Sequence, residues 1–177
     1  MKLKHINILI IDDSKYDREL IKRTLSTHFP NSLFILVEGL KDYIEKISWL
    51  KPDIILCDYD LRDSDGLEIL ILSKKTWDVP IVFVTGSNNE EEVARAIFKG
   101  ANGYVLKDNL DQLHLIVEKA ITEMMEDKDR AKDKIEMFNQ IKLDVQKIGN
   151  HTITMSSYSK SINSINLLEK RLLNVQK

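Results

Sequence analysis

The sequence contains a single cysteine, Cys57, so an internal disulfide is impossible. Such low cysteine use is typical of proteins kept in a reducing compartment. Long hydrophobic runs are also missing: the apolar run near the start ends at Asp12 and Asp13, well short of the roughly 20 residues that cross a bilayer. We therefore expect a cytoplasmic protein that has no membrane segment.

An excess of positive charge is lacking as well. The 26 lysines and arginines are balanced by 28 acidic residues, which gives a formal net charge of −2. Proteins that bind nucleic acid through its phosphates need a basic surface that releases counterions. We expect no nucleic-acid binding here. The 43% of hydrophobic and 31% of charged residues are the balance of a globular protein with a core.

Short apolar runs alternate with amphipathic segments over the first 125 residues. The runs are rich in Ile, Val and Leu and are continuously apolar, as in parallel strands buried on both faces. They are Ile6–Ile11, Leu33–Val37, Asp53–Cys57, Ile81–Thr85 and Tyr104–Leu106. Pro52 and Pro80 stand directly before two of them, where a strand tolerates proline. The alternation predicts an α/β fold, a five-stranded parallel doubly wound sheet with right-handed crossovers.

Capping patterns predict where three of the helices begin. In each, a capping side chain stands three residues before an acid. The pairs are Ser14 with Asp17, Asn88 with Glu91, and Asp108 with Asp111. Gly100 is expected to end the second helix. The residues expected to face the core are Leu20, Ile21, Thr24 and Leu25 in the first helix, Val93, Ala94, Ile97 and Phe98 in the second, and Leu113, Ile116, Val117, Ala120 and Ile121 in the third.

The composition changes after Met125. Residues 126–134 are charged apart from Ala131 and include neither proline nor glycine, which indicates a solvated continuation of the last helix. Gly149-Asn150 is expected to end it. On each side of Gly149-Asn150, apolar residues recur at three- and four-residue spacing, which predicts a helical hairpin or a coiled coil. They are Phe138, Ile141, Val145 and Ile148, followed by Ile165, Leu168, Leu172 and Val175. We expect two domains, 1–125 and 126–177.

Polar residues gather at the ends of the predicted strands. Asp12 and Asp13, Asp58, Thr85 and Lys107 come from four strands whose carboxyl ends share one edge of the sheet. Acids placed together repel one another unless a cation joins them, and their oxygens suit Mg²⁺. With Mg²⁺, Lys107 and Thr85 binding phosphoryl oxygens, Asp58 is the expected nucleophile and an acyl phosphate the expected product.

Four segments carry a family resemblance: Ile10–Asp13, Cys57–Asp58, Val84–Gly86 and Tyr104–Lys107. They resemble, in the same order, the receiver domain of two-component response regulators, and the resemblance covers residues 5–125. It implies a flavodoxin-like sheet with strand order 2-1-3-4-5. It also implies that a histidine kinase or a phosphotransfer protein donates a phosphoryl group to Asp58.

The same resemblance implies a magnesium site and a switch. Asp13 and Asp58 would bind Mg²⁺ directly, Asp12 through water, and Asp60 through its backbone carbonyl. Thr85 and Tyr104 match the family's switch pair, in which the hydroxyl moves toward the phosphoryl oxygen and the aromatic ring turns inward. The family's lysine usually precedes a proline in a cis peptide. Here Asp108 follows it, and since a cis bond without proline costs about 3 kcal/mol, a trans bond is expected.

The expected output is a protein–protein interaction that phosphorylation controls through the tail, including a homodimer through the C-terminal helices or the last receiver helix. The acid Asp60 could repel the phosphoryl group or orient a hydrolytic water. On this interpretation the protein is no enzyme, although it supports its own phosphorylation and dephosphorylation. One alternative is a Mg²⁺-dependent aspartyl-phosphate phosphatase or phosphotransferase, for which Asp58-Tyr59-Asp60 supplies a pair of acids. Another is a receiver cut from a longer protein with a catalytic output domain.

Overall fold

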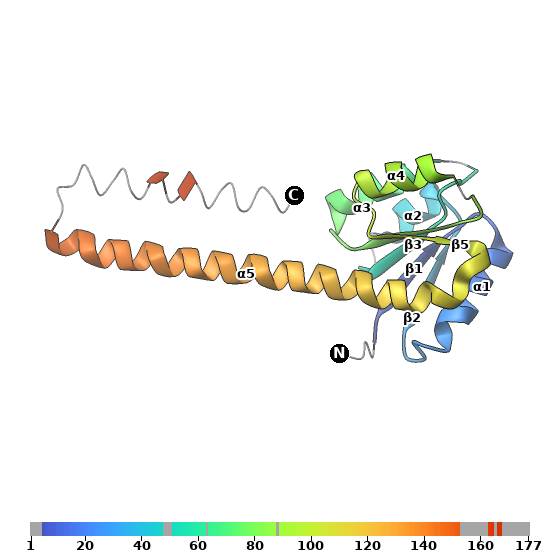
Figure 1. Ribbon diagram of the computed structural model, residues 1–177, viewed down its shortest axis with the longest axis horizontal. Coiled ribbons are helices and arrows are strands. Elements are labelled where there is room, and N and C mark those ends of the chain that lie inside the picture. Colours follow the sequence, from blue (N-terminus) through green and yellow to red (C-terminus); the bar gives the residue numbers. More distant parts are fainter. Residues whose placement is uncertain are drawn as a thin grey trace. The chain divides into compact units, whose positions relative to one another are not determined.

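Five parallel strands form one sheet in the order β2-β1-β3-β4-β5, with helices on both of its faces (Figure 1). The computed structural model describes residues 5–47, 51–62, 64–87, 89–152, 163–164 and 166–167. The strands are β1 (Asn7–Ile11), β2 (Leu33–Val37), β3 (Ile54–Cys57), β4 (Ile81–Thr85) and β5 (Gly103–Leu106). Each agrees with its predicted run to within one residue at either end. The doubly wound α/β fold and its strand order are confirmed.

Helices connect the strands. They are α1 (Lys15–Ser26), α2 (Leu40–Ile47), α3 (Gly66–Thr76), α4 (Glu90–Phe98) and α5 (Leu113–Thr152), with a 3₁₀ segment at Lys107–Gln112. The chain divides into two compact units, Met1–Met124 and Met125–Lys177, and the sheet lies in the first. No helix among the described residues is both long and apolar enough to span a bilayer.

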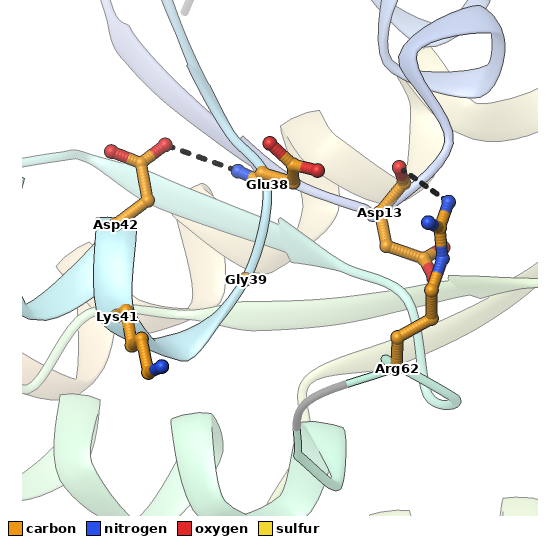
Figure 2. Close-up of a pocket in the computed structure, with 6 residues that line it drawn as sticks. All are labelled: Asp13, Glu38, Gly39, Lys41, Asp42 and Arg62. Carbon is orange, nitrogen blue, oxygen red and sulfur yellow. Dashed lines mark hydrogen bonds and ion pairs between the residues drawn. The ribbon is translucent and has the colours of Figure 1, made fainter.

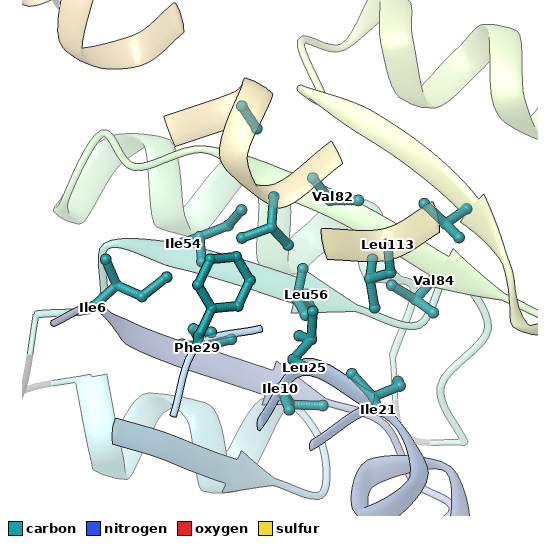
Figure 3. Packing of buried hydrophobic residues seen from close by; sticks show 14 of the residues in the cluster. Ile6, Ile10, Ile21, Leu25, Phe29, Ile54, Leu56, Val82, Val84 and Leu113 are labelled. Carbon is teal, nitrogen blue, oxygen red and sulfur yellow. The ribbon is translucent and has the colours of Figure 1, made fainter. Parts of the chain in front are cut away.

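The side chains of alternate residues in each strand pack into two separate hydrophobic cores, one on each face of the sheet. In β1, Ile8 and Ile10 pack with α1 and the first turns of α5, whereas Leu9 and Ile11 pack with α2, α3 and α4. Figure 3 shows the first of these cores, where Phe29 lies among side chains of the central strands. Since successive side chains of a strand point to opposite faces, a strand covered on both sides must be apolar throughout. This is the reason for the continuous apolar runs.

The start of α1 follows the predicted cap. Ser14 has extended backbone angles, and its side chain accepts a hydrogen bond from the amide of Asp17. Ile21 and Leu25 are buried, as expected for the inward face. The cap and the apolar stripe together fix the helix against the sheet.

The expected phase of α4 was wrong. Its cap is Asn89, whose side chain accepts from the amide of Glu91, rather than Asn88, which lies outside the described residues. Ala96 is the buried residue of this helix, whereas Ile97 and Phe98 are 48% and 89% exposed. A helix turns by about 100° per residue, so a register one or two residues off moves a side chain from the core to solvent. Gly100 does end the helix region, with a φ of +94° that favours glycine.

The predicted start of the last helix, at Asp108 and Asp111, was also wrong. A 3₁₀ segment occupies Lys107–Gln112 and is kinked at Asn109, which has non-helical backbone angles, and α5 begins at Leu113. The expected inward residues of α5 are nevertheless buried, except for the partly buried Ile116. The described chain contains no cis peptide bond, so the bond after Lys107 is trans as expected.

Beyond Met124, α5 continues to Thr152. It passes Gly149-Asn150, so the expected stop there was wrong; a helix tolerates an internal glycine at a cost of about 1 kcal/mol. Phe138 and Val145 are half-buried, and Ile141 is 43% exposed. The side chain of Ile148 and the second apolar series, 165–175, lie outside the described residues apart from isolated positions. The hairpin or coiled coil stays a prediction.

Gly66, the first residue of α3, packs directly beneath the strand end that carries Asp58. A Cβ at this position would lie 2.5 Å from the Asp58 carbonyl oxygen and 2.8 Å from a ring carbon of Phe83. We predict that Gly66→Ala lowers the free energy of unfolding by about 1–3 kcal/mol, the usual cost of overpacking. Urea denaturation measures this. Gly86→Ala is the control, since a Cβ there meets nothing within 4 Å; equal losses in the two variants would contradict the packing argument.

Candidate functional site

The polar residues predicted from the strand ends lie at one edge of the sheet. Asp12 and Asp13 follow β1, Asp58 follows β3, Thr85 ends β4, and Lys107 follows β5. One carboxylate oxygen from each of Asp12, Asp13 and Asp58 lies within 4.8 Å of the others. Because all five strands are parallel, their carboxyl ends coincide, and the sheet itself brings these side chains together.

Backbone hydrogen bonds hold the acids in place. The Asp12 amide donates to the Val37 carbonyl at 3.1 Å, and the Asp58 amide donates to the Ile11 carbonyl at 2.8 Å. The Arg18 guanidinium from α1 donates to the Asp12 carbonyl. Asp12 is fully buried and Asp58 is only 7% exposed. These acids therefore belong to the rigid part of the fold.

The ammonium of Lys107 lies among three carboxylates. Its Nζ is 2.7 Å from Asp12 Oδ2, 2.8 Å from Asp17 Oδ2 and 2.7 Å from Asp58 Oδ2. Burial alone would lower the pKa of Lys107, but the contacts with Asp12, Asp17 and Asp58 outweigh it and raise the pKa above its ordinary value. Lys107 therefore stays charged throughout the physiological range.

Asp12 carries a buried oxygen that lacks a full set of partners. Its Oδ1 accepts from the Ser14 amide at 2.8 Å. Its Oδ2 contacts the Lys107 ammonium but completes no hydrogen bond among the described residues. Burial raises the pKa of Asp12, and Lys107 and the Ser14 amide offset this only in part. An underpaired buried carboxylate oxygen beside two further acids is what a hard divalent cation requires, so these residues fit Mg²⁺.

Asp13 faces a different cation. Arg62, from the segment after β3, places its Nε 2.5 Å from Asp13 Oδ2, and its Nη2 donates to the Asp13 carbonyl at 3.3 Å. Figure 2 shows this pair at one side of a cavity of about 270 Å³. The other residues that line the cavity are Glu38, Gly39, Lys41 and Asp42. Arg62 is 76% exposed at its side chain, so the pair is screened by solvent and contributes little stability.

Thr85 and Tyr104 are linked through Ser87. The buried Thr85 hydroxyl accepts from the Ser87 amide at 3.2 Å. The Tyr104 hydroxyl donates to the Ser87 carbonyl at 2.8 Å, and its ring is half-buried. Both members of the expected switch pair thus contact one segment, between β4 and α4. Whether they move on phosphorylation stays a prediction.

Asp60 lies beside the acceptor. Its amide is 3.4 Å from Asp58 Oδ1, a long hydrogen bond. Asp60 is exposed, but desolvation by its neighbours raises its pKa, and the negative charges of Glu92, Asp58 and Asp65 add to this. The side chain is therefore in a repulsive environment. The role of its backbone carbonyl as a metal ligand stays a prediction.

Two residues of the site were missed from the sequence. Asp17 was assigned only to the start of α1, yet its carboxylate reaches Lys107. Arg62 was not considered, because nothing in the order of residues shows that the segment after β3 turns back to Asp13. The contact of Asp17 could have been suspected from the sequence. Asp17 lies in the first turn of a helix, four residues after Asp13, and one helical turn brings its side chain back over the end of β1.

We predict that Asp12→Asn stabilises the protein in metal-free buffer at neutral pH. Because the folded-state pKa of Asp12 is raised, its ionised form favours the unfolded chain, and wild-type stability falls as pH rises above the ordinary carboxyl pKa. The variant should lack this decline. It should also gain less stability from Mg²⁺, since a ligand stabilises the state that binds it. Thermal unfolding with EDTA or Mg²⁺ measures both effects; a variant less stable than wild type in EDTA would show that the contact with Lys107 outweighs burial.

Comparison with known proteins agrees with this arrangement. Residues 8–118 match the family described as the response regulator receiver domain. The transcriptional regulatory protein YdfI of Bacillus subtilis is 34% identical over 101 residues, which are 57% of this chain and 47% of YdfI. The chain spans about half the length of the curated relatives it matches.

Two solved structures extend the comparison. A two-component response regulator from Clostridium difficile is 30% identical, with a TM-score of 0.61, over 68% of this chain and 98% of that chain. The Mn²⁺-bound form of the response regulator Rcp1 is 26% identical, with a TM-score of 0.56, over 63% of this chain and 91% of that chain. The family match covers more than half of the sequence and the sheet has the corresponding strand order. This chain belongs to the response regulator receiver domain family.

Proposed function

We propose that Asp58 accepts a phosphoryl group from a histidine kinase or a phosphotransfer protein, in a receiver that spans residues 1–125. The observation that carries this proposal is the position of Asp58 Oδ2, 2.7 Å from the Lys107 ammonium in a nearly closed acidic site. A carboxylate is a weak nucleophile, and catalysis of phosphoryl transfer consists mainly of positioning and of charge neutralisation. The site supplies both.

The transfer uses the groups at the sheet edge. A carboxylate oxygen of Asp58 attacks phosphorus and forms a new P–O bond. The bond from phosphorus to the donor breaks, and its electron pair leaves with the donor. Lys107 binds one phosphoryl oxygen as negative charge spreads over the group, and the Thr85 hydroxyl, at the end of the neighbouring strand β4, would bind another.

Mg²⁺ would neutralise a third phosphoryl oxygen. Asp13 and Asp58 would bind it directly and Asp12 through water. The backbone carbonyl of Asp60 would be the remaining protein ligand. The clustering of Asp12, Asp13 and Asp58 within 4.8 Å supports this, as does the buried, underpaired oxygen of Asp12. The Mn²⁺-bound form of Rcp1 supports a divalent cation by analogy.

The direct test is the intact mass after incubation with acetyl phosphate and Mg²⁺. We predict that the wild type gains one phosphoryl group and that Asp58→Asn gains none, because the amide cannot form the acyl phosphate. Glu19→Gln is the matched control, since it removes an acid from the surface of α1, where Glu19 pairs with Lys22, and should leave the modification in place. Phosphorylation of Asp58→Asn, or an unmodified wild type beside a competent reference receiver, would contradict the proposal.

We also propose that the helical extension, residues 126–177, carries the output. The 3₁₀ segment that contains Lys107 leads directly into α5, and α5 continues past Met124 without a break. A change at Lys107 or Tyr104 therefore has a short covalent route to the extension. The output would be a protein–protein contact, including a homodimer through the C-terminal helices or through α5.

A phosphoryl analogue tests this output. We predict that beryllofluoride with Mg²⁺ changes either the molar mass in solution or the amide exchange of residues 125–152, because bound analogue shifts the equilibrium between two arrangements of α5. Light scattering and hydrogen–deuterium exchange measure the two quantities. Asp58→Asn, treated in the same way, is the control. Identical mass and identical exchange with and without analogue would exclude a role for the extension in the response.

A further inference from the structure

Lys107 has a partner that the phosphoryl-acceptor chemistry does not require. Its Nζ donates complete hydrogen bonds to two carboxylates, Asp58 at 2.7 Å and Asp17 at 2.8 Å. Its contact with Asp12 is close in distance but completes no hydrogen bond. Asp17 is the partner of Lys107 that lies outside the acidic cluster of Asp12, Asp13 and Asp58. It comes from α1, 90 residues earlier in the sequence.

The local structure explains why the Asp17 carboxylate is available. An acid three residues after a capping serine usually turns back to the amide of that serine. Here the Ser14 amide donates to Asp12 Oδ1 at 2.8 Å, so the usual partner of Asp17 is taken. Ser14 still caps the Asp17 amide through its hydroxyl. The Asp17 carboxylate therefore does not cap the helix and accepts a hydrogen bond from Lys107 instead.

The anchor is also stiff. Ile21 and Leu25, on the next turns of α1, are almost completely buried in the core beneath the sheet. The side chains of Asp17 and Lys107 are 26% and 18% exposed, so water screens their contact only weakly. Lysine has a flexible four-carbon stem, and an acceptor on a fixed helix restricts where its ammonium can lie.

We propose that Asp17 is a positioning residue that holds the Lys107 ammonium against Asp58 and retains it when a phosphoryl group is bound there. This inference rests on the proposed function of Asp58. An ammonium has three donors. Once Asp58 is modified, a phosphoryl oxygen takes the place of Asp58 Oδ2 as acceptor, while the hydrogen bond to Asp17 persists. Asp17 is not a member of the acidic cluster of Asp12, Asp13 and Asp58, so we expect it to affect the binding of the phosphoryl group and not that of the metal.

Calorimetric titration separates these two effects. We expect Asp17→Asn to weaken the binding of beryllofluoride in saturating Mg²⁺ by about fivefold to tenfold, the loss typical of one charge-assisted hydrogen bond. Its affinity for Mg²⁺ alone should stay within about twofold of wild type. Glu19→Gln is the matched control: it removes the same charge from the same helix, and Glu19 pairs with Lys22 at 3.9 Å on the surface of the described chain. It should change neither affinity.

A second set of variants tests whether Asp17 acts through Lys107. In a Lys107→Met background, Asp17→Asn should have no further effect on beryllofluoride binding, and Asp17→Glu in the wild type should restore part of the loss. Equal affinities for Asp17→Asn and Glu19→Gln would overturn the inference, as would an undiminished Asp17→Asn effect without Lys107. If the wild type binds no beryllofluoride, the proposed function of Asp58 fails and this inference with it.

Discussion

The structure depends on one positive charge at the end of the sheet. Asp12, Asp17 and Asp58 lie within hydrogen-bonding distance of a single ammonium, that of Lys107. Without it, three carboxylates would be held together in a largely buried place with nothing to offset their repulsion. The pKa of Lys107 is raised by its contacts with the carboxylates, which outweigh burial, whereas the pKa of Asp12 is raised by burial, which Lys107 and the Ser14 amide offset only in part. One ammonium therefore does not fully compensate the buried acids, and their oxygens fit a divalent cation.

The topology of the sheet places the acids and Lys107 close together. Each central strand is buried on both faces, which fixes its end, and the parallel order brings four ends to one edge. Gly66 allows α3 to approach the carbonyl of Asp58 closely. Among the described residues of the site, Arg62 and Asp60 are exposed, whereas Asp12 and Asp58 are buried. The rigidity of the core is therefore a condition of the chemistry, because preorganised charge needs no rearrangement during transfer.

Sequence reasoning was most accurate where one physical rule determined the structure. Continuous apolar runs that alternate with amphipathic segments are typical of parallel strands covered on both sides, so the sheet and the placement of Asp12, Asp13, Asp58, Thr85 and Lys107 at its strand ends were predictable. The strand order came from the resemblance to receiver domains. Whether these residues perform the expected roles is a matter for experiment. The phase of α4 was not predictable, because Ala96 packs inward in place of larger neighbours and leaves Phe98 in solvent. Capping patterns gave the start of α1 and failed for α5, where the 3₁₀ segment intervenes.

The residues missed at the site were those whose direction depends on competition for one hydrogen bond. Asp12 accepts from the Ser14 amide, and the Asp17 carboxylate accepts from Lys107 in place of that amide. Arg62 reaches Asp13 only because of the path taken after β3. Neither contact can be predicted from the spacing or the composition of the sequence. Such contacts are also where this chain can differ from other receivers that share its strand-end residues.

The central claim is that Asp58 is the covalent acceptor, and chemical trapping of the acyl phosphate tests it most directly. After phosphorylation, borohydride reduces an acyl phosphate to an alcohol and leaves free carboxylates unchanged, so tandem mass spectrometry can locate the modified residue. The account predicts a single reduced side chain, at position 58. Reduction at Asp12, Asp13 or Asp60, with position 58 unchanged, would contradict it.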